Sequence, residues 1–324
     1  MKNLILKALQ QEQPISGEKL AKSLNISRTA VWKHINQLRN SGYQIGSSPR
    51  SGYYLIKSTD LLLPEEIGLN LNTKIMGKRI VHQKEIPSTQ DMAAELARQG
   101  AIEGTTVIAE MQTRGRGRKG REWVSVSGGG IYLSLILRPN LAPSQILQIP
   151  LVAGVALVKS IEKIDSLQPR IKWPNDILIG KRKVGGILTE MNCEIDEVNF
   201  VILGIGINVN IPGSLLAAET TSLASSLSEE YGEHISRARL VQSFLNEFEI
   251  IYGQYMKSGF DSIRDDWKHL NNTIGSWIKA NDGGKETEGL ALDIDNEGFL
   301  LVKKENGDVS RIISGDISLS NRAG

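Results

Sequence analysis

Two helix signals separated by a very short turn occur in Ser16-Gly-Glu-Lys-Leu-Ala-Lys-Ser-Leu-Asn-Ile-Ser-Arg-Thr-Ala-Val-Trp-Lys-His-Ile-Asn-Gln-Leu-Arg-Asn-Ser-Gly42. Ser16 and Ser27 are each placed to cap a helix, because a serine hydroxyl accepts a hydrogen bond from the first free backbone N–H groups. Between them lies Asn25, a residue that tolerates the left-handed conformation found at helix ends. This arrangement is typical of a helix-turn-helix, whose second helix enters the major groove of DNA.

The helix after Ser27 has an apolar face made by Val31, Ile35 and Leu38, and Gly42 ends it. Trp32 is expected to pack against the protein rather than to contact DNA. The outward face carries side chains suited to phosphates and base edges. The residues expected to contact DNA are Ser27, Arg28, Thr29, Lys33 and Asn36, and Arg39 lies on the same face. The alternative is a three-helix module that binds another protein.

The residues on either side complete this module. A helix that ends before Pro14 is predicted by an apolar repeat at Leu4, Ile5, Ala8 and Leu9. After Gly42, residues 43–45 and 53–56 alternate like strands, joined by a glycine- and serine-rich turn. A short hairpin after the second helix makes a winged helix, with Arg50 at the tip of the wing placed to meet a phosphate.

The charge distribution agrees with an anionic partner for this module alone. Residues 1–60 contain nine Lys or Arg and three Asp or Glu, a net charge of +6. The remaining residues contain 29 basic and 33 acidic side chains, a net charge of −4. A basic module on an acidic body favours binding of nucleic acid by the first part of the chain.

Composition excludes several classes of protein. The chain has 324 residues, 40% of them hydrophobic and 23% charged, which indicates two or three globular domains and excludes disordered and fibrous proteins. Apolar runs such as residues 155–158 are far shorter than the roughly 20 residues that cross a bilayer. The apolar part of the amino end is too short for a secretory signal. The single cysteine, Cys193, forms no intramolecular disulfide, so a cytoplasmic protein is expected.

A basic, glycine-rich loop follows the strand predicted at residues 105–111. Residues 112–121 are Gln-Thr-Arg-Gly-Arg-Gly-Arg-Lys-Gly-Arg, and their glycines match the G-x-G-x-x-G pattern. The dinucleotide interpretation fails, because residues 122–126 look like a strand rather than a helix and no acidic residue stands about 20 positions onward. Five cations instead predict a loop that closes over a phosphate or carboxylate. The alternatives are an Arg/Gly nucleic-acid segment and a solvated charge run.

Polar residues also stand at a helix start and at several strand ends. Ser88 and Thr89 precede a helix at 92–99, where they either cap it or offer its free N–H groups to a ligand. Four more polar residues end apolar strands: Asn175, Asp176, Lys183 and Asn208. Together with the loop they resemble a nucleotide and anion site, in which Asp176 is a candidate to hold Mg²⁺. The sequence has no P-loop motif, no defensible Ser/His/Asp or Cys/His spacing, and only scattered histidines, which makes a zinc site improbable.

The last part of the chain predicts a small β domain. Short strands are expected at 274–280, 288–294, 299–303 and 309–313, separated by Asn/Asp-Gly turn signals. This pattern favours an SH3-like β-barrel, and a three- or four-stranded open sheet is the alternative.

Four motifs in this order resemble those of the biotin–protein ligases: Gly115–Arg121 with Trp123, Lys172-Trp-Pro-Asn-Asp176, Lys183–Glu190 and Gly204-Ile-Gly-Ile-Asn208. The winged-helix module makes the chain similar to the bifunctional members that also repress the biotin operon. The resemblance covers essentially the whole chain. It implies an α/β multidomain fold: a winged helix-turn-helix (1–62), a central mixed α/β catalytic domain resembling class II synthetases (63–270) and an SH3-like domain (271–324).

The resemblance also implies roles for single residues. It implies biotin contacts at Ser88, Thr89, Gln90, Gln112, Arg116, Gly117, Arg118 and Lys183. It implies ATP contacts at Asn175, Asp176, Asn208 and Arg121, with residues 116–121 covering the adenylate. Some members have a basic residue at the position of Ser320, so this chain departs from them there.

The implied chemistry fits these residues. The biotin carboxylate attacks the α-phosphate of ATP to give biotinyl-5′-AMP, and a lysine of a biotin carboxyl carrier protein then attacks this mixed anhydride. Cations matter more than a general base when two anions meet, so Arg116, Arg118, Lys183 and an Asp176-bound Mg²⁺ are the expected catalytic groups. Operator DNA and a second copy of the chain are the further expected partners. The alternatives are a repressor that senses a small acid without turnover, and a protein that binds RNA through residues 114–121.

Overall fold

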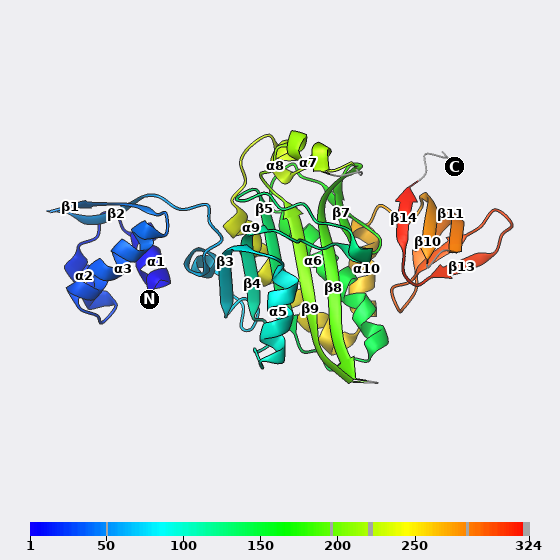
Figure 1. Cartoon of the computed structure of the whole chain (residues 1–324), viewed down its shortest axis with the longest axis horizontal. Helices are drawn as coiled ribbons and strands as arrows, with labels where there is room; N and C mark the ends of the chain where they lie inside the picture. Colours follow the sequence, from blue (N-terminus) through cyan, green and yellow to red (C-terminus); the bar gives the residue numbers. More distant parts are fainter. Residues whose placement is uncertain (50, 195–196, 220–222, 283–284, 320–324) are drawn as a thin grey trace. The chain divides into compact units, whose positions relative to one another are not determined.

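The computed structural model describes residues 1–49, 51–194, 197–219, 223–282 and 285–319. The chain forms two compact units (Figure 1). One consists of Met1–Asn72 with Ser236–Gln242, and the other of Thr73–Ile235 with Ser243–Gly324. The division into three domains with boundaries after residues 62 and 270 stays a prediction, since the second unit contains two separate sheets.

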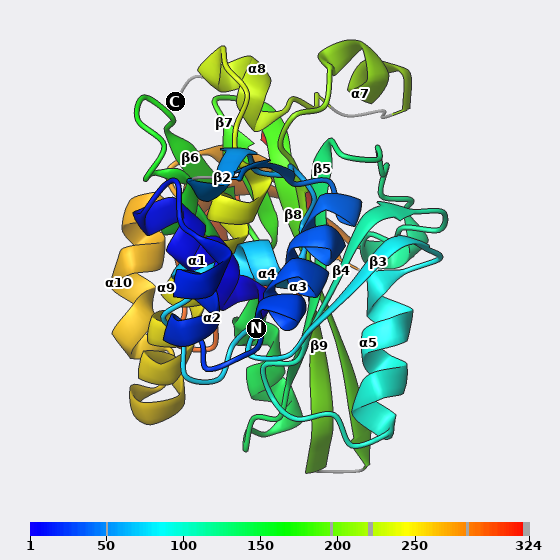
Figure 2. The same cartoon turned by 90° about the vertical axis from the view of Figure 1, so that its left-hand side faces the viewer.

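The first unit begins with three helices around an apolar core, α1 (Lys2–Gln11), α2 (Gly17–Ser23) and α3 (Arg28–Asn40) (Figure 2). Ser16 Oγ accepts a hydrogen bond from the backbone N–H of Lys19 at 3.1 Å, which confirms the first predicted cap. Ser27 Oγ accepts one from Ala30 N–H, also at 3.1 Å. Asn25 has a φ of 52°, the left-handed conformation that the turn requires. Local signals in the sequence therefore build the helix-turn-helix.

A two-stranded antiparallel wing follows, made of β1 (Gln44–Ser48) and β2 (Gly52–Lys57). Arg50, predicted at its tip, lies outside the described residues. After the wing come α4 (Pro64–Ile67), which begins at its proline, and the short helix η1 (Gly68–Asn70). Leu4 is 51% exposed and does not join the core, because Ile5, Leu6 and Leu9 form the inward face of α1.

The second unit is built on a seven-stranded sheet in the order β3-β4-β5-β9-β8-β7-β6. Its strands are β3 (Ile80–Ile86), β4 (Thr106–Gln112), β5 (Gly130–Leu137), β6 (Pro169–Lys172), β7 (Asp176–Ile179), β8 (Arg182–Glu194) and β9 (Glu197–Asn208). β3 and β4 run parallel, and all other neighbours run antiparallel. A parallel pair needs a crossover connection, which α5 (Thr89–Arg98) supplies. The predicted mixed α/β body is confirmed.

Helices cover both faces of this sheet. Figure 1 shows α5 on one side and α6 (Ile149–Ile161) on the other. The apolar run Pro143–Ile161 is long enough to cross a membrane, but 72% of its most apolar window is buried inside the protein, so it is a core element of the fold. The other helices of this unit include η3 (Pro143–Gln148), α7 (Gly213–Glu219), α8 (Leu227–Tyr231), α10 (Asp261–Leu270) and most of α9 (Arg237–Ser258).

Residues 122–126 do not form the predicted strand. Glu122 makes one isolated bridge with Arg116, and regular pairing begins only at β5. The cause is Trp123, whose ring lies against Gly186 of β8 and Gly206 of β9. The segment therefore crosses the face of the sheet instead of pairing with another strand.

The carboxy-terminal sheet has five antiparallel strands in the order β13-β12-β11-β10-β14. They are β10 (Trp277–Asp282), β11 (Lys285–Ile294), β12 (Leu300–Lys303), β13 (Val309–Ile312) and β14 (Asp316–Leu319). This sheet is the expected SH3-like domain with one strand more than predicted. The additional strand is β14, Asp-Ile-Ser-Leu, which pairs with β10.

Candidate active site

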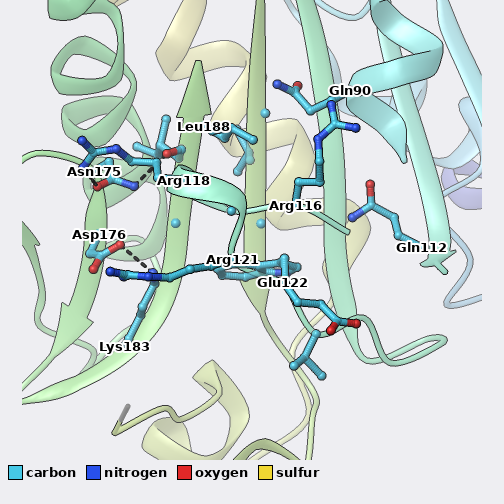
Figure 3. A pocket seen from close by; sticks show the side chains of 18 of the residues that line it. Gln90, Gln112, Arg116, Arg118, Arg121, Glu122, Asn175, Asp176, Lys183 and Leu188 are labelled. Carbon is cyan, nitrogen blue, oxygen red and sulfur yellow. Dashed lines mark hydrogen bonds and ion pairs between the residues drawn. The ribbon is translucent and has the colours of Figure 1, made fainter. Parts of the chain in front are cut away.

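One cavity of about 620 Å³ lies beside the carboxyl end of β4, the first half of β8 and the last part of β9. Figure 3 shows it from close by. It gathers all the residues predicted to hold the small acid or the nucleotide, namely Ser88, Thr89, Gln90, Gln112, Arg116, Gly117, Arg118, Arg121, Asn175, Asp176, Lys183 and Asn208. These residues come from segments up to 120 positions apart (88 to 208). Because each polar strand end is ambiguous by itself, their convergence is the informative observation.

A buried polar network forms one end of the cavity. Thr89 donates to Gln112 Oε1 through its backbone N–H at 2.7 Å and through its hydroxyl at 2.9 Å. Ser134 Oγ lies 2.8 Å from Thr89 Oγ1 and donates to Gln90 Oε1 at 2.9 Å. Gln90 Nε2 in turn donates to Glu190 at 3.1 Å. Such a connected network fixes the orientation of the donors and acceptors that face the cavity.

Two buried polar atoms at this site have no hydrogen-bond partner among the described residues. Ser88 Oγ is one, although Ser88 occupies the N-cap position of α5, where a serine normally accepts a bond from the helix. Trp123 Nε1 is the other. Since buried polar groups are nearly always paired, both atoms are available to a polar ligand or to water. Ser88 occupies the N-cap position of α5 without making the side-chain cap bond.

The loop over the cavity is anchored at both ends by its own cations. On one side Arg116 binds Asp91 Oδ1 at 2.6 Å and Glu190 Oε2 at 3.2 Å. On the other side Arg118 donates to Asn175 Oδ1 at 2.9 Å and to the carbonyl of Gly315 at 3.1 Å. Figure 3 shows Arg118 beside Asn175 and Arg116 near Gln90, on opposite sides of the cavity. The loop lies across the cavity, as the sequence predicted.

The carboxy-terminal sheet contributes one side chain to the cavity, Asp316 at the start of β14. Arg121 forms a short ion pair with Asp316, and Lys119 Nζ lies 3.6 Å from the same carboxylate. Burial lowers the pKa of Arg118, which the nearby Asp316 and Asp176 carboxylates partly offset. The loop is therefore fastened to the last strand of the chain.

An ion pair marks the nucleotide end of the predicted site. Lys183 Nζ lies 2.6 Å from Asp176 Oδ1 and 5.4 Å from the centre of the Trp123 ring. Lys172, which was quoted in a motif but given no role, lies nearby, and burial lowers its pKa. Asn208 is buried and donates to the carbonyl of Ser225 at 3.1 Å. Cations and an amide thus lie around the carboxylate of Asp176.

The donor set bears on the predicted metal. Among the described residues there is no group of three His, Cys, Asp or Glu side chains that could hold a metal ion. Mg²⁺ is often held by one or two carboxylates together with substrate phosphates, and Asp176 fits that requirement as a single protein carboxylate.

Sequence reasoning missed some residues that line or support this cavity. Ser134 lies inside a strand and belongs to none of the quoted motifs, whereas Glu190 ends a quoted motif in which that residue was given no role. Asp316 begins β14, a strand that was not predicted from the sequence. Trp123 was quoted in a motif without a role, and the glycines at 186 and 206 were the available signal, because a glycine pair in a strand leaves room for a ring.

The predicted DNA-contacting residues lie on the outer surface of the first unit. Arg28, Thr29 and Lys33 are exposed and Asn36 is half-buried, while Ser27 Oγ accepts the cap bond of α3. Arg39 instead supports the wing, donating to the carbonyl of Ile45 at 2.9 Å. The prediction for Trp32 was wrong: it is 58% exposed, because other side chains already fill the inward face of α3.

Known proteins resemble this chain over nearly all of its length. Residues 83–208 match the biotin/lipoate A/B protein ligase family, residues 2–54 an HTH domain, and residues 273–320 the biotin protein ligase C terminal domain. The chain is 46% identical over 94% of both chains to the bifunctional ligase/repressor BirA of Bacillus spizizenii. It is 31% identical to that of Escherichia coli, over 94% of this chain and 92% of the other. The biotin protein ligase of Aquifex aeolicus, solved with biotin and ATP, matches with a TM-score of 0.63 and 30% identity, covering 75% of this chain and 99% of that one.

Proposed function

The chain belongs to the family of bifunctional biotin–protein ligases and repressors, and from this premise we propose that it biotinylates a carrier protein and represses transcription. The observation that carries the proposal is the single cavity that joins an unsatisfied polar pocket to a cluster of cations under one loop. That cavity suits a ligand with a polar head at one end and a phosphate at the other.

The polar pocket suits biotin. The ureido ring of biotin has both N–H donors and a carbonyl acceptor, which the unpaired Ser88 Oγ and the network around Thr89 and Gln112 can complement. The apolar part of biotin fits beside Trp123, over strands whose glycines leave the sheet surface flat. Biotin would then extend along the sheet with its carboxylate towards Lys183.

In the first step the biotin carboxylate oxygen attacks the α-phosphorus of ATP. A new C(O)O–P bond forms, the bond to the bridging oxygen breaks, and pyrophosphate leaves with its electron pair. The reacting groups are all anions, so their approach needs nearby cations. The attraction of these cations to the reacting oxygens strengthens as charge develops in the transition state. Arg116, Arg118 and Lys183 supply these cations, and the loop excludes water from the resulting anhydride.

ATP would contact the opposite end of the cavity. Asn175, Asp176, Asn208 and Arg121 are the proposed contacts. Asp176 would hold Mg²⁺ together with phosphate oxygens, and bound Mg²⁺ supplies charge neutralisation to the phosphates. Asp176 also orients Lys183 through their 2.6 Å ion pair.

In the second step the amine of a carrier-protein lysine attacks the acyl carbon of biotinyl-5′-AMP. An amide bond forms, the acyl–oxygen bond breaks, AMP leaves, and the amine loses a proton. The partner is the biotin carboxyl carrier protein of a biotin-dependent carboxylase. Because carboxylases and operator DNA both occur in the cytoplasm of bacteria, the cytoplasm is the proposed location.

The first unit supports the second activity. Its helix-turn-helix and wing expose Arg28, Thr29 and Lys33 as DNA-contacting side chains. Biotinyl-5′-AMP is the proposed corepressor, and a homodimer is the proposed DNA-binding form, since a two-fold dimer matches an operator of two half-sites.

The test incubates the full chain with biotin, ATP and Mg²⁺, followed by mass spectrometry for retained biotinyl-5′-AMP and an assay of pyrophosphate. Addition of a biotin carboxyl carrier protein should then discharge the adenylate and increase the mass of the carrier. DNA binding without pyrophosphate release would indicate a sensing repressor and overturn the ligase proposal. The Asp176→Asn variant, which is expected to form little adenylate, gives the background signal of the assay.

A further inference from the structure

A large aromatic side chain lies open to solvent on the helix proposed to enter DNA. Trp32 is 58% exposed, whereas Val31, Ile35 and Leu38 of the same helix are fully buried. An exposed indole leaves apolar surface in contact with water, which is unfavourable unless a partner covers it. The core of the first unit does not use Trp32, so its ring is available to a partner.

The neighbours of Trp32 point to a polyanion. Residues four apart in a helix lie one above the other, so Arg28, Trp32 and Asn36 form one row along α3. Lys33 lies beside this row and is exposed. No acidic side chain among the described residues pairs with Arg28 or Lys33. An apolar ring beside free cations fits a groove that has negative charges along its two sides and apolar groups at its base.

We propose that Trp32 reads DNA sequence directly, its indole contacting the C5-methyl group of a thymine in the major groove. The inference rests on the proposed repressor function, since it assigns a residue to that same surface. Cations flanking the ring reach phosphates, which carry no sequence information. The thymine methyl is the apolar feature that base edges present in the major groove, so it is the group that a neutral ring recognises.

The charge of the surface separates this proposal from a protein partner. A second copy of the chain or another protein would have to cover Trp32 while accommodating Arg28 and Lys33. The first 60 residues carry a net charge of +6, so two copies of this surface repel one another. Duplex DNA meets both requirements at once.

The experiment begins with a duplex enriched from a random-sequence pool by the full chain in the presence of biotin, ATP and Mg²⁺. Each thymine of that duplex is then replaced in turn by deoxyuridine, which removes only the methyl group. At one or two positions per half-site we expect wild-type affinity to fall about 3- to 5-fold. Trp32→Ala should weaken binding of the unmodified duplex at least about 10-fold and should lose its sensitivity to deoxyuridine there.

Two controls separate a base contact from other effects. Lys33→Ala should lower the slope of log affinity against log salt by about 1, whereas Trp32→Ala should leave that slope unchanged, because tryptophan carries no charge. Trp32→Phe should retain part of the methyl sensitivity. Equal biotinyl-5′-AMP formation by wild type and Trp32→Ala verifies that the variant chain is intact, and equal amide-exchange protection of α1 to α3 verifies that the first unit is folded.

The outcomes are distinguishable. A wild-type chain that enriches no duplex overturns the repressor function and this inference with it. A wild-type chain that binds DNA while Trp32→Ala binds equally well overturns only the inference. So does a Trp32→Ala variant that keeps the full deoxyuridine effect. A Trp32→Ala change in sedimentation without a change in DNA affinity assigns Trp32 to a protein contact and also overturns it.

Discussion

Trp123 lies so close to Gly206 that a Cβ atom added to Gly206 would stand 2.5 Å from Trp123 Cε2. The same holds for Gly186, the residue paired with Gly206 across β8 and β9, where a Cβ would stand 2.9 Å from the ring. Two bare backbone positions on neighbouring strands therefore form the surface on which the ring lies. The ring is also near Lys183, so its position is linked to the cation of the proposed first step.

Gly206→Ala should displace Trp123 and weaken biotin binding. The new methyl group occupies space that the ring fills, and overpacking of this kind costs about 1–3 kcal/mol. If the ring moves, that cost appears as a biotin Kd raised about 10-fold or more, measured by calorimetry. Gly253→Ala in α9, where a Cβ meets nothing within 4 Å, is the matched control and should leave Kd unchanged. An unaltered Kd in Gly206→Ala would show that Trp123 is not part of the biotin site.

Arg118→Ala should keep the fold and release biotinyl-5′-AMP early. Its guanidinium joins the loop to Asn175 and to the carbonyl of Gly315, and loss of a charge-assisted contact costs about 1.5–3 kcal/mol. Stopped-flow dissociation of the adenylate should accelerate about 10- to 100-fold. Lys119→Ala should change the dissociation rate little, since the Lys119 side chain is exposed and its ion pair with Asp316 is long, at 3.6 Å. Equal dissociation rates for wild type and Arg118→Ala would exclude this role.

Asp176→Asn should reduce adenylate formation at least about 100-fold. The change removes the acidic group that pairs with Lys183, which is also the proposed carboxylate for Mg²⁺, and both interactions act on the charge of the reaction. Pyrophosphate release under saturating biotin and ATP is the measurement. Asp266→Asn is the control, because Asp266 is an exposed residue of α10 that pairs with Lys159. This variant should release pyrophosphate at the wild-type rate. A wild-type rate for Asp176→Asn would leave Asp176 as a turn residue.

The sequence predicted those parts of the fold that depend on local signals. Ser16 and Ser27 cap their helices, Asn25 takes its left-handed turn, and the strands around Asn175 and Asn208 lie where periodicity put them. Each depends on the nearest few residues, which the sequence displays directly. The grouping of Asn175, Asp176, Lys183 and Asn208 with the basic loop was inferred from the residues themselves, whereas the biotin contacts came from the family resemblance.

The failures concern residues whose environment is set by distant parts of the chain. Residues 122–126 have strand-like composition, but the ring of Trp123 rests on two glycines far along the sequence and draws the segment across the sheet. Trp32 is the exception: it was expected to pack against the protein, but it lies outside the apolar face that Val31, Ile35 and Leu38 form on its own helix. Asp316 became a site residue only through the pairing of β14 with β10. Local periodicity contains no information on the contacts of Trp123 or Asp316.

The loop over the cavity suggests how the two activities are linked. Its cations are held by Asp91 and Glu190 on one side and by Asp316 on the other, all within the second unit. We expect a ligand with an added phosphate to bind the closed loop better than biotin alone, because the cations of the loop can contact that phosphate, and a ligand that prefers one conformation shifts the loop towards it. If a dimer surface adjoins the closed loop, ligand binding favours the dimer, and the dimer must tighten ligand binding by the same factor.

Biotinyl-5′-AMP should therefore promote a homodimer, while biotin alone should do so less. Sedimentation equilibrium with and without the adenylate should show a monomer–dimer constant at least about 10-fold tighter with it, the lower range of a coupling free energy of about 1–3 kcal/mol. Operator binding should tighten in parallel, because a two-fold dimer contacts two half-sites at once. Arg118→Ala is the informative variant: with the adenylate saturating, a loop that closes poorly should give weaker dimerisation, whereas Lys119→Ala should resemble wild type. Identical dimer constants with and without the adenylate, together with equally tight operator binding, would remove the corepressor mechanism and leave a ligase whose DNA-binding unit acts independently.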